Sequence, residues 1–365
     1  MKSFIQFLSL AVFFMVSQAS HAALNVFACE PEWGALVQEL GGDKVTVFTA
    51  TNAMQDVHHI EAKPSLVAQL RKADMLVCTG TELEIGWLPV LLRQSGNINV
   101  QPGKPGNFEA AHFVRMLEVP SRLDRAEGDV HPGGNPHIQT DPRNIAKVGE
   151  ALAQRLAEID ATNAAFYQGR HKDFSQRWLD AVKRWESQAA PLKGMSIVVQ
   201  HKGFPYLEDW LGLKEVAALE PKPGVEPSGT HLAEVLAQLQ RQPARMVIRA
   251  AYNSDRPSQW LSEKAKIPAV ALPYTVGGSE RAKDLFSLFD DTVQRLLEAA
   301  NAKVQSGISG PVYASNSDMA AIVAINRALR GDRSVMEQLG RRRDSKGCEV
   351  QPLTLTAGHG AGIAS

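Results

Sequence analysis

The chain has 365 residues, enough for two domains of ordinary size. Its 39 basic side chains balance its 39 acidic ones, which argues against a general nucleic-acid-binding protein, because such proteins carry a basic excess. Three cysteines are too few for a disulfide-rich scaffold or a cysteine-based zinc finger, and an apolar fraction of 44% is enough to bury a core.

The N-terminus has the pattern of a secretory signal peptide. Lys2 precedes an apolar run at 4–16, and Ser20-His21-Ala22 offers a cleavage site with small residues around it. The run is shorter than the roughly 20 residues that a membrane-spanning helix needs. We therefore expect residues 1–22 to be removed on export, which places the mature protein in an oxidising compartment such as a bacterial periplasm. Cys29 lies beyond this cleavage position, so no lipoprotein anchor is expected.

After residue 22, strand patterns and helix patterns alternate in two successive sets. In the first set, strands are expected at 24–29, 45–49 and 75–78, and helices at 33–40, 64–73 and 142–159, with irregular loop at 101–136. One long helical pattern without proline follows. In the second set, strands are expected at 196–200, 216–219, 245–248 and 269–272, and helices at 206–211, 231–239, 259–266 and 281–300.

This alternation predicts an α/β fold with two lobes, each built on a parallel sheet and joined by one long rigid helix. The expected parts are a signal peptide at 1–22, an N-terminal lobe at 23–161, a linker helix at 162–188, a C-terminal lobe at 189–300 and a loosely ordered extension at 301–365. Open parallel sheets bind ligands at the carboxyl ends of their strands and between lobes. A site is therefore expected in the cleft between the lobes.

Three histidines occupy such positions. His58 lies in the loop after the second strand, His137 lies just before the helix at 142–159, and His201 directly follows the strand at 196–200. Imidazole nitrogen suits zinc, and also copper, nickel and iron(II), and three imidazoles leave a fourth tetrahedral position open. A single loop histidine is more often a surface or hydrogen-bonded residue, so spacing alone does not establish a metal site.

Several motifs together resemble the zinc and manganese solute-binding proteins of bacterial ABC importers. They are Val57-His58-His59-Ile60-Glu61-Ala62-Lys63-Pro64, Ala73-Asp74-Met75-Leu76-Val77, Asn135-Pro136-His137 with Asp141-Pro142-Arg143-Asn144, Val199-Gln200-His201-Lys202-Gly203-Phe204 and Glu226-Pro227-Ser228. Each motif is weak alone, but their combination over about residues 24–300 is specific. The resemblance implies metal ligands at His58, His137 and His201, and it makes the long helix the family's rigid connection between lobes.

The same resemblance implies a receptor, not an enzyme, that acts as a periplasmic monomer. Its cargo would be zinc, with manganese as the second choice, and its partner would be the membrane permease of an ABC importer. Family members usually add a carboxylate from a late loop of the second lobe, whereas Pro273–Gly278 carries no acid before Glu280, and Val57 stands where some members have an acid beside the first histidine. Water, Glu280 and Glu61 stay open as fourth ligands, with water ranked first. The missing carboxylate favours a nitrogen-rich zinc site over an oxygen-rich manganese site.

The other histidines and the cysteines leave choices open. His131 lies in a loop that many zinc-binding members enrich in histidine, and it is interpreted either as an aid to metal loading or as an ordinary loop residue. His59 is interpreted as a residue that supports His58 or faces solvent, and His171 and His231 are interpreted as solvent-facing or structural. Cys29 and Cys78 each end a predicted strand of the first lobe, so a disulfide between them is possible, and Cys348 would then be unpaired.

Two other function classes remain to be weighed. A secreted zinc hydrolase would use the open coordination position to activate water and would need a general base, for which Glu61 is the acid considered. The sequence has no His-Glu-x-x-His motif and no serine elbow, which disfavours this class. A surface adhesin without a metal is the third alternative. The combination of motifs favours the metal receptor over both.

Overall fold

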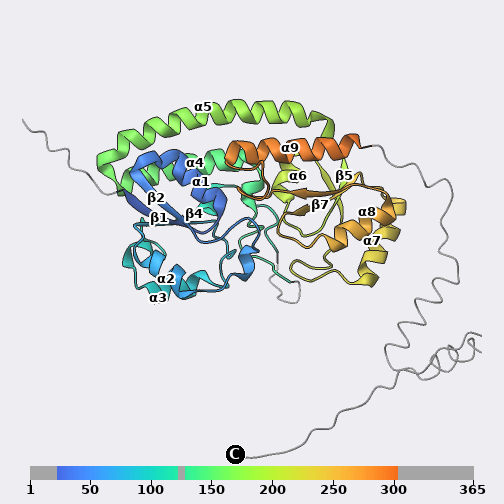
Figure 1. Ribbon diagram of the computed structural model, residues 1–365, viewed down its shortest axis with the longest axis horizontal. Coiled ribbons are helices and arrows are strands. Elements are labelled where there is room, and N and C mark those ends of the chain that lie inside the picture. Colours follow the sequence, from blue (N-terminus) through green and yellow to red (C-terminus); the bar gives the residue numbers. More distant parts are fainter. Residues whose placement is uncertain (1–22, 122–127, 303–365) are drawn as a thin grey trace, which may run out of the picture. The chain divides into compact units, whose positions relative to one another are not determined.

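The computed structural model describes residues 23–121 and 128–302, so the predicted signal segment at 1–22 and nearly all of the predicted extension lie outside the described residues. The N-terminal lobe is a four-stranded parallel sheet in the order β2-β1-β3-β4, with helices packed against it (Figure 1). Its strands are β1 (Leu24–Ala28), β2 (Val45–Thr49), β3 (Met75–Cys78) and β4 (Asn107–Glu109), and its helices are α1 (Pro31–Gly41), α2 (Pro64–Arg71), α3 (Leu88–Ser95) and α4 (Pro142–Ile159).

The C-terminal lobe repeats this topology with a second parallel sheet in the order β6-β5-β7-β8. Its strands are β5 (Ser196–Val199), β6 (Lys214–Ala218), β7 (Met246–Ala250) and β8 (Ala269–Leu272), and its helices are α6 (Pro205–Leu211), α7 (Gly229–Arg241), α8 (Arg256–Ala265) and α9 (Leu285–Asn301). In both lobes the first strand lies between the second and the third, so the loops that follow these strands share one sheet edge.

Local sequence explains where the main helices begin. The Asp141 side chain accepts a hydrogen bond from the backbone N–H of Arg143, and Pro142 occupies the first turn, where its missing N–H costs nothing. Helix α9 begins with a reciprocal capping box between Asp284 and Ser287. Helix α1 also starts with a proline and ends before Gly42, whose φ of 53° suits a residue without a side chain.

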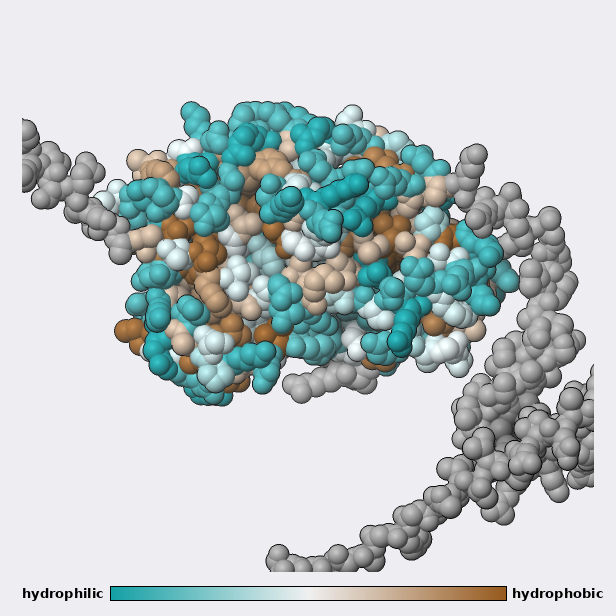
Figure 2. Space-filling model, viewed as in Figure 1, coloured by the Kyte–Doolittle hydropathy of each residue, from teal (hydrophilic) through white to brown (hydrophobic). Residues whose placement is uncertain are grey.

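One long helix, α5 (Ala164–Ala189), connects the two lobes. It lies along α4 of the N-terminal lobe and along α9 of the C-terminal lobe (Figure 1). The indole N–H of Trp178 donates to the carbonyl of Pro142 at the start of α4, while that of Trp185 donates to Asp290 on α9. Both tryptophan rings are fully buried and pack edge to face. The helix is therefore fixed to both lobes by buried contacts, while hydrophilic residues cover most of the molecule's upper edge in Figure 2, where α5 runs.

The cores explain the layered architecture. One continuous cluster of buried side chains includes residues of both sheets and of α1, α4, α5 and α9. A second cluster covers the opposite face of the first sheet with α2 and α3, and a third covers the opposite face of the second sheet with α7 and α8. Both sheets are thus buried on both faces, as parallel sheets require. The predicted α/β fold with two parallel-sheet lobes and one long connecting helix is confirmed.

Three elements depart from the sequence analysis. Strand β4 and a 3-10 helix (Ala110–Phe113) lie within the segment expected to be irregular loop, and α3 was not predicted. Strand β4 has three residues, too few to show a period of two, and it pairs with β3 because the chain at Gly106 passes close to the backbone of Asp74 and Asn99. No helix among the described residues combines the length and apolar character needed to cross a bilayer.

Candidate metal centre

His58 is held at the carboxyl edge of the first sheet. It lies in a short 3-10 helix (Val57–His59) that follows β2, and the Asp56 side chain accepts hydrogen bonds from its backbone N–H at 3.0 Å and from its ring Nδ1 at 2.8 Å. The indole of Trp87 donates to the carbonyl of Val57 at 2.9 Å and fixes the same turn. The His58 side chain is only 9% exposed. Its backbone position and its ring orientation are therefore both set by neighbouring groups.

His137 and His201 are tied together across the two lobes. His137 lies just before a 3-10 helix (Ile138–Thr140) that leads into α4, and His201 lies two residues after β5. Asn135 links the two loops, because its side chain accepts from the backbone N–H of His137 at 3.1 Å and donates to the carbonyl of Lys202 at 2.8 Å. Burial, followed by the nearby His58, lowers the pKa of His137 well below its usual value. A neutral ring of this kind offers a nitrogen lone pair.

The structure brings the three predicted histidines together. Their ring centroids are 5.5 Å apart for His58 and His137, 5.5 Å for His137 and His201, and 6.0 Å for His58 and His201. Three imidazoles around one tetrahedral zinc ion, with bonds of about 2.1 Å, would have centroids about 5 Å apart. The observed arrangement is somewhat more open than that. Among the described residues, the one group of three ligand atoms that all lie within 4.8 Å of one another is Cys29, Cys78 and Glu84, and its two cysteines form a disulfide.

Two carboxylates orient the histidine rings. The Nδ1 atom of His58 is 2.8 Å from Asp56, and the Nδ1 atom of His201 is 2.7 Å from Oε2 of Glu220. A carboxylate is an acceptor, so each Nδ1 carries the proton, and in the neutral ring Nε2 keeps its lone pair. This carboxylate–histidine arrangement is the usual support of a metal-binding imidazole. Sequence reasoning missed both acids, although Asp56 lies two residues before His58 and Glu220 follows β6 at the sheet edge that also carries His201.

These contacts give a first prediction. Replacing Asp56 with asparagine or Glu220 with glutamine keeps the shape of each site but removes the charge that supports the imidazole, and we expect either variant to lower metal affinity roughly 10-fold to 100-fold. Competition with a chromophoric chelator measures this. Glu61→Gln is the matched control, because Glu61 is 82% exposed, and it should bind like the unchanged protein. Unchanged affinity in both test variants would show that the carboxylates do not support metal binding.

The structure also places His131 beside this group. Its Nε2 atom lies 3.2 Å from Nε2 of His58, and the two ring centroids are 5.3 Å apart. Burial lowers the pKa of His131 to about 4, the charge of His58 acts in the same direction, and a hydrogen bond with the backbone of Thr81 opposes both. The sequence left two interpretations of His131 open, an aid to metal loading or an ordinary loop residue. Its position next to the other histidines favours the first. The sequence signal was the run Asp129-Val130-His131 just before Asn135-Pro136-His137.

The remaining candidate ligands are exposed or have other partners. Glu61 is exposed and lies 3.9 Å from Lys63, and Glu280 is exposed. His59 is exposed, with its ring centroid 6.2 Å from that of His58. His171 and His231 have local partners, Ser175 and the carbonyl of Ala218 respectively, in keeping with the structural role expected of them.

Two cavities meet at the histidines. The larger, of about 360 Å³, is lined by His131, His137, His201 and the supporting Glu220, together with charged groups that include Glu118, Asp129, Lys202 and Lys222. A smaller one of about 30 Å³ lies against His58 and His137 and is lined by Glu32, Tyr274 and Thr275 among others. The larger cavity gives the site a polar entrance whose wall carries both carboxylates and lysines.

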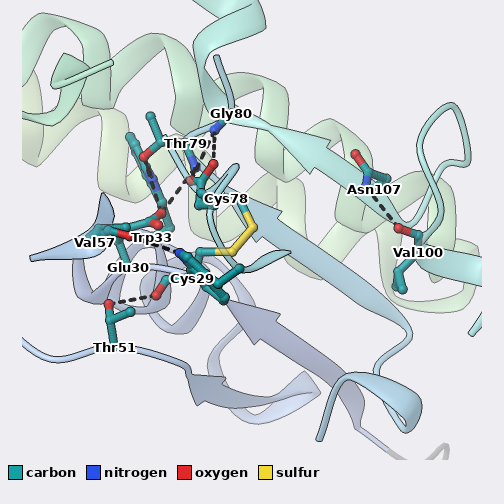
Figure 3. Close-up of a disulfide and its surroundings, with 12 residues drawn as sticks. Cys29, Glu30, Trp33, Thr51, Val57, Cys78, Thr79, Gly80, Val100 and Asn107 are labelled. Atoms are coloured by element: carbon teal, nitrogen blue, oxygen red, sulfur yellow. Dashed lines mark hydrogen bonds between the residues drawn. A yellow bond between two sulfur atoms is a disulfide. The ribbon is translucent and has the colours of Figure 1, made fainter. Parts of the chain in front are cut away.

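A buried acidic cluster lies next to the site, at the ends of β1 and β3. Cys29 and Cys78 form a disulfide, and their Cα atoms are 4.8 Å apart (Figure 3). They can pair because the two residues lie at the ends of neighbouring strands. Glu84 accepts hydrogen bonds from the backbone N–H groups of Thr79 and Gly80, and burial raises its pKa to about 7. Figure 3 shows Glu30, Thr79 and Gly80 beside the disulfide. The cluster therefore ties together the loops that follow both strands.

Glu32, on α1, connects this side of the site to the other lobe. Its carboxylate accepts a hydrogen bond from the hydroxyl of Thr275 at 2.5 Å, and burial raises its pKa to about 7. The adjacent Tyr274 ring lies 5.6 Å from the ring of His137, and its hydroxyl donates to the carbonyl of Gly203. The loop in which the family resemblance predicts a carboxylate thus places an aromatic ring beside the histidines.

Comparison with known proteins identifies the family. Residues 26–299 match the family model described as zinc-uptake complex component A, periplasmic. The manganese ABC transporter substrate-binding lipoprotein PsaA of Streptococcus mitis is 21% identical over 77% of this chain and 91% of that protein. The zinc-binding lipoprotein AdcA of Streptococcus pneumoniae is 25% identical over 63% of this chain and 46% of that protein.

Solved structures of such proteins share the fold of this chain. A crystal structure of ZnuA matches with a TM-score of 0.64 and 22% identity, and the match covers 76% of this chain and 99% of that one. The relatives include proteins named for manganese and proteins named for zinc, so the comparisons identify a divalent metal without choosing between the two. The resemblance seen in the sequence motifs is confirmed. The chain belongs to the family of periplasmic zinc-uptake components, the substrate-binding receptors of metal ABC importers, and it is a receptor rather than an enzyme.

Proposed function

We propose that this protein is a periplasmic zinc receptor that captures Zn²⁺ with His58, His137 and His201 and delivers it to the permease of an ABC importer. The observation that carries the proposal is the approach of these three rings, from loops of both lobes, to centroid distances of 5.5–6.0 Å. The carboxylates behind His58 and His201 support it, because they leave a lone pair on Nε2 of each neutral ring.

The donor set favours zinc over manganese. Imidazole nitrogen binds zinc well, whereas manganese prefers carboxylate, carbonyl and water oxygens. The carboxylates closest to the histidines, Asp56 and Glu220, already accept hydrogen bonds from ring nitrogens. They are thus committed to supporting the imidazoles, and the site offers nitrogen where manganese would prefer oxygen.

Delivery requires a small opening between the lobes. Helix α5 is continuous and is fixed to α4 and α9 by the buried Trp178 and Trp185. A continuous helix has no loop residues to absorb large dihedral changes, so we propose limited lobe movement rather than wide closure. We also propose that the exported chain begins after residue 22 and acts as a monomer, with the lobes and linker divided as the sequence predicts. A disulfide at Cys29 is consistent with an oxidising compartment and with a receptor that carries no lipid on this residue.

The test is metal selectivity measured on matched triple variants. We expect the unchanged protein to bind about one Zn²⁺ per chain by calorimetry and to prefer zinc over manganese in direct competition. The variant H58A/H137A/H201A should lose this binding, because all three proposed ligands are removed. The control H59A/H112A/H171A removes the same number of imidazoles outside the site and should bind as before. Equal zinc affinity in the two triple variants would refute the site, and a preference for manganese would refute the choice of metal.

A further inference from the structure

We infer that His131 is the fourth ligand of the metal and that it contributes to the preference for zinc over manganese, an inference that rests on the proposed function. The Nε2 atoms of His131 and His58 are 3.2 Å apart. Two nitrogens bound to one tetrahedral zinc ion at about 2.1 Å would be about 3.4 Å apart. The observed pair of nitrogens already has almost the spacing that shared coordination requires.

A hydrogen bond behind the His58 ring determines which of its nitrogens can face a metal ion. His58 donates its Nδ1–H to Asp56 at 2.8 Å. The neutral His58 ring therefore has an unprotonated Nε2, and this is the atom that faces Nε2 of His131. A cation between the two nitrogens can accept a lone pair from each ring. The pair is therefore arranged for a positively charged ligand.

The loop that carries His131 is fixed to both lobes. We call residues 128–136 the His131 loop. On the C-terminal side, the backbone N–H of Asp129 donates to the carbonyl of Pro223 at 3.0 Å, and Gly128 has a φ of +86° and lies so close that a Cβ would be 2.2 Å from the same carbonyl oxygen. On the N-terminal side, a Cβ at Gly133 would be 2.7 Å from the methyl group of Thr81. The glycines thus let the loop reach both lobes and place His131 between them.

The turn on which His131 rests is itself held in an uncommon conformation. Gly80, Thr81 and Glu82 have consecutive positive φ values of 80°, 54° and 63°. A threonine in this region is strained, and such strain persists only where surrounding contacts impose it. Glu84 imposes it here, because its carboxylate accepts from the backbone N–H groups of Thr79 and Gly80. The contact between the turn and His131 is therefore built into the fold of the first lobe.

His131 also occupies the role that the sequence left to water, Glu280 or Glu61. Both acids are exposed, and Glu61 lies next to Lys63. A fourth imidazole in place of a carboxylate makes the donor set entirely nitrogen, which zinc accepts and manganese disfavours. A water ligand would leave one oxygen in the donor set, which discriminates less strongly against manganese than a fourth nitrogen does. The identity of residue 131 is therefore a determinant of selectivity.

The experiment compares three variants with zinc, manganese and Co²⁺ as probes. We expect His131→Ala to weaken zinc binding 10-fold to 100-fold and to change the visible absorption bands of bound Co²⁺, because one nitrogen donor is replaced by water. His131→Asp restores four protein ligands but supplies an oxygen, so the ratio of manganese to zinc affinity should rise at least 10-fold over that of the unchanged protein. His112→Ala is the control, since that imidazole is 69% exposed and pairs with Glu109.

The outcomes separate this inference from the proposed function. If His131→Ala leaves both the zinc affinity and the Co²⁺ spectrum unchanged, His131 is not a ligand, although the three-histidine receptor would stand. An unchanged metal ratio in His131→Asp would overturn the claim about selectivity. If the unchanged protein binds no zinc, the proposed function itself fails. Thermal unfolding without metal should be the same in all three variants and in the unchanged protein, which excludes a general loss of folding.

Discussion

Replacing His137 with alanine should lower zinc affinity on the order of 10²-fold to 10³-fold. Zinc binding by four protein ligands is worth about 10–16 kcal/mol, so one ligand accounts for about 3 kcal/mol, and each 1.4 kcal/mol is a factor of ten. The His137 ring lines both cavities and is only 4% exposed. A water molecule that replaces it therefore has little space in which to bind the metal at the same position. Competition with a chelator of known zinc affinity measures the change.

His171→Ala is the matched control for this variant. It removes a partly buried histidine of α5 whose ring is hydrogen bonded to Ser175, and its zinc affinity should equal that of the unchanged protein. If His137→Ala binds zinc within a factor of three of the unchanged protein while it remains folded by circular dichroism, His137 is not a ligand.

Removing the disulfide should lower the free energy of unfolding by about 4 kcal/mol. Cys29 and Cys78 are separated by 49 residues, and a loop of that length restricts the unfolded chain by about this amount in the chain-entropy description. Chemical unfolding of C29A/C78A, followed by tryptophan fluorescence, measures the loss. The effect should appear with an intact metal site, because the disulfide lies behind the loops and contributes no proposed ligand.

The control for the disulfide prediction is Cys348→Ala, which removes the remaining cysteine. It should unfold at the same denaturant concentration as the unchanged protein under oxidising conditions. A reducing agent should lower the stability of the unchanged protein to that of C29A/C78A and leave C29A/C78A as it was. Equal stability of C29A/C78A and the unchanged protein in oxidising buffer would contradict a stabilising role for this bond.

The sequence predicted the architecture well because the architecture depends on periodic burial. The strands of parallel sheets covered on both faces appear as short apolar runs, and the tryptophans and phenylalanines of α5 recur at helical spacing from Phe166 to Trp185. Element ends moved by a few residues, as with α9, which begins at Leu285 rather than 281 because Asp284 and Ser287 form its cap. Strand β4 escaped prediction because three residues carry no period.

Part of the candidate site could also be predicted, from the order of strands and helices along the chain. Histidines that follow strands or precede helices at a common sheet edge can be recognised from chain order, and the structure brings His58, His137 and His201 together. The groups that support them depend on contacts between loops. Glu220 reaches His201 from the neighbouring strand, and His131 reaches His58 across 73 positions of the chain. The run Asp129-Val130-His131 marked His131 as a candidate, but no local pattern encodes which residue a loop meets, because this follows from how two loops pack after the sheets have formed.

The relatives named for zinc and for manganese make the choice of donor atoms the main chemical question for this receptor. Asp56 and Glu220 support histidines from behind, and Tyr274 stands in the late loop of the second lobe beside His137. With His131 added, the residues around the centre offer nitrogen. The selectivity between zinc and manganese then depends on which residues reach the metal. These residues lie at a few loop positions, which can differ between proteins of the same fold.

The central claim is that one zinc ion is held where the two lobes meet, and an anomalous difference map of zinc-loaded crystals, collected at the zinc absorption edge, tests it most directly. We predict one strong peak within about 2.1 Å of ring nitrogens of His58, His137 and His201. A dominant peak at another group of side chains, with these three rings unliganded, would contradict the proposed receptor site.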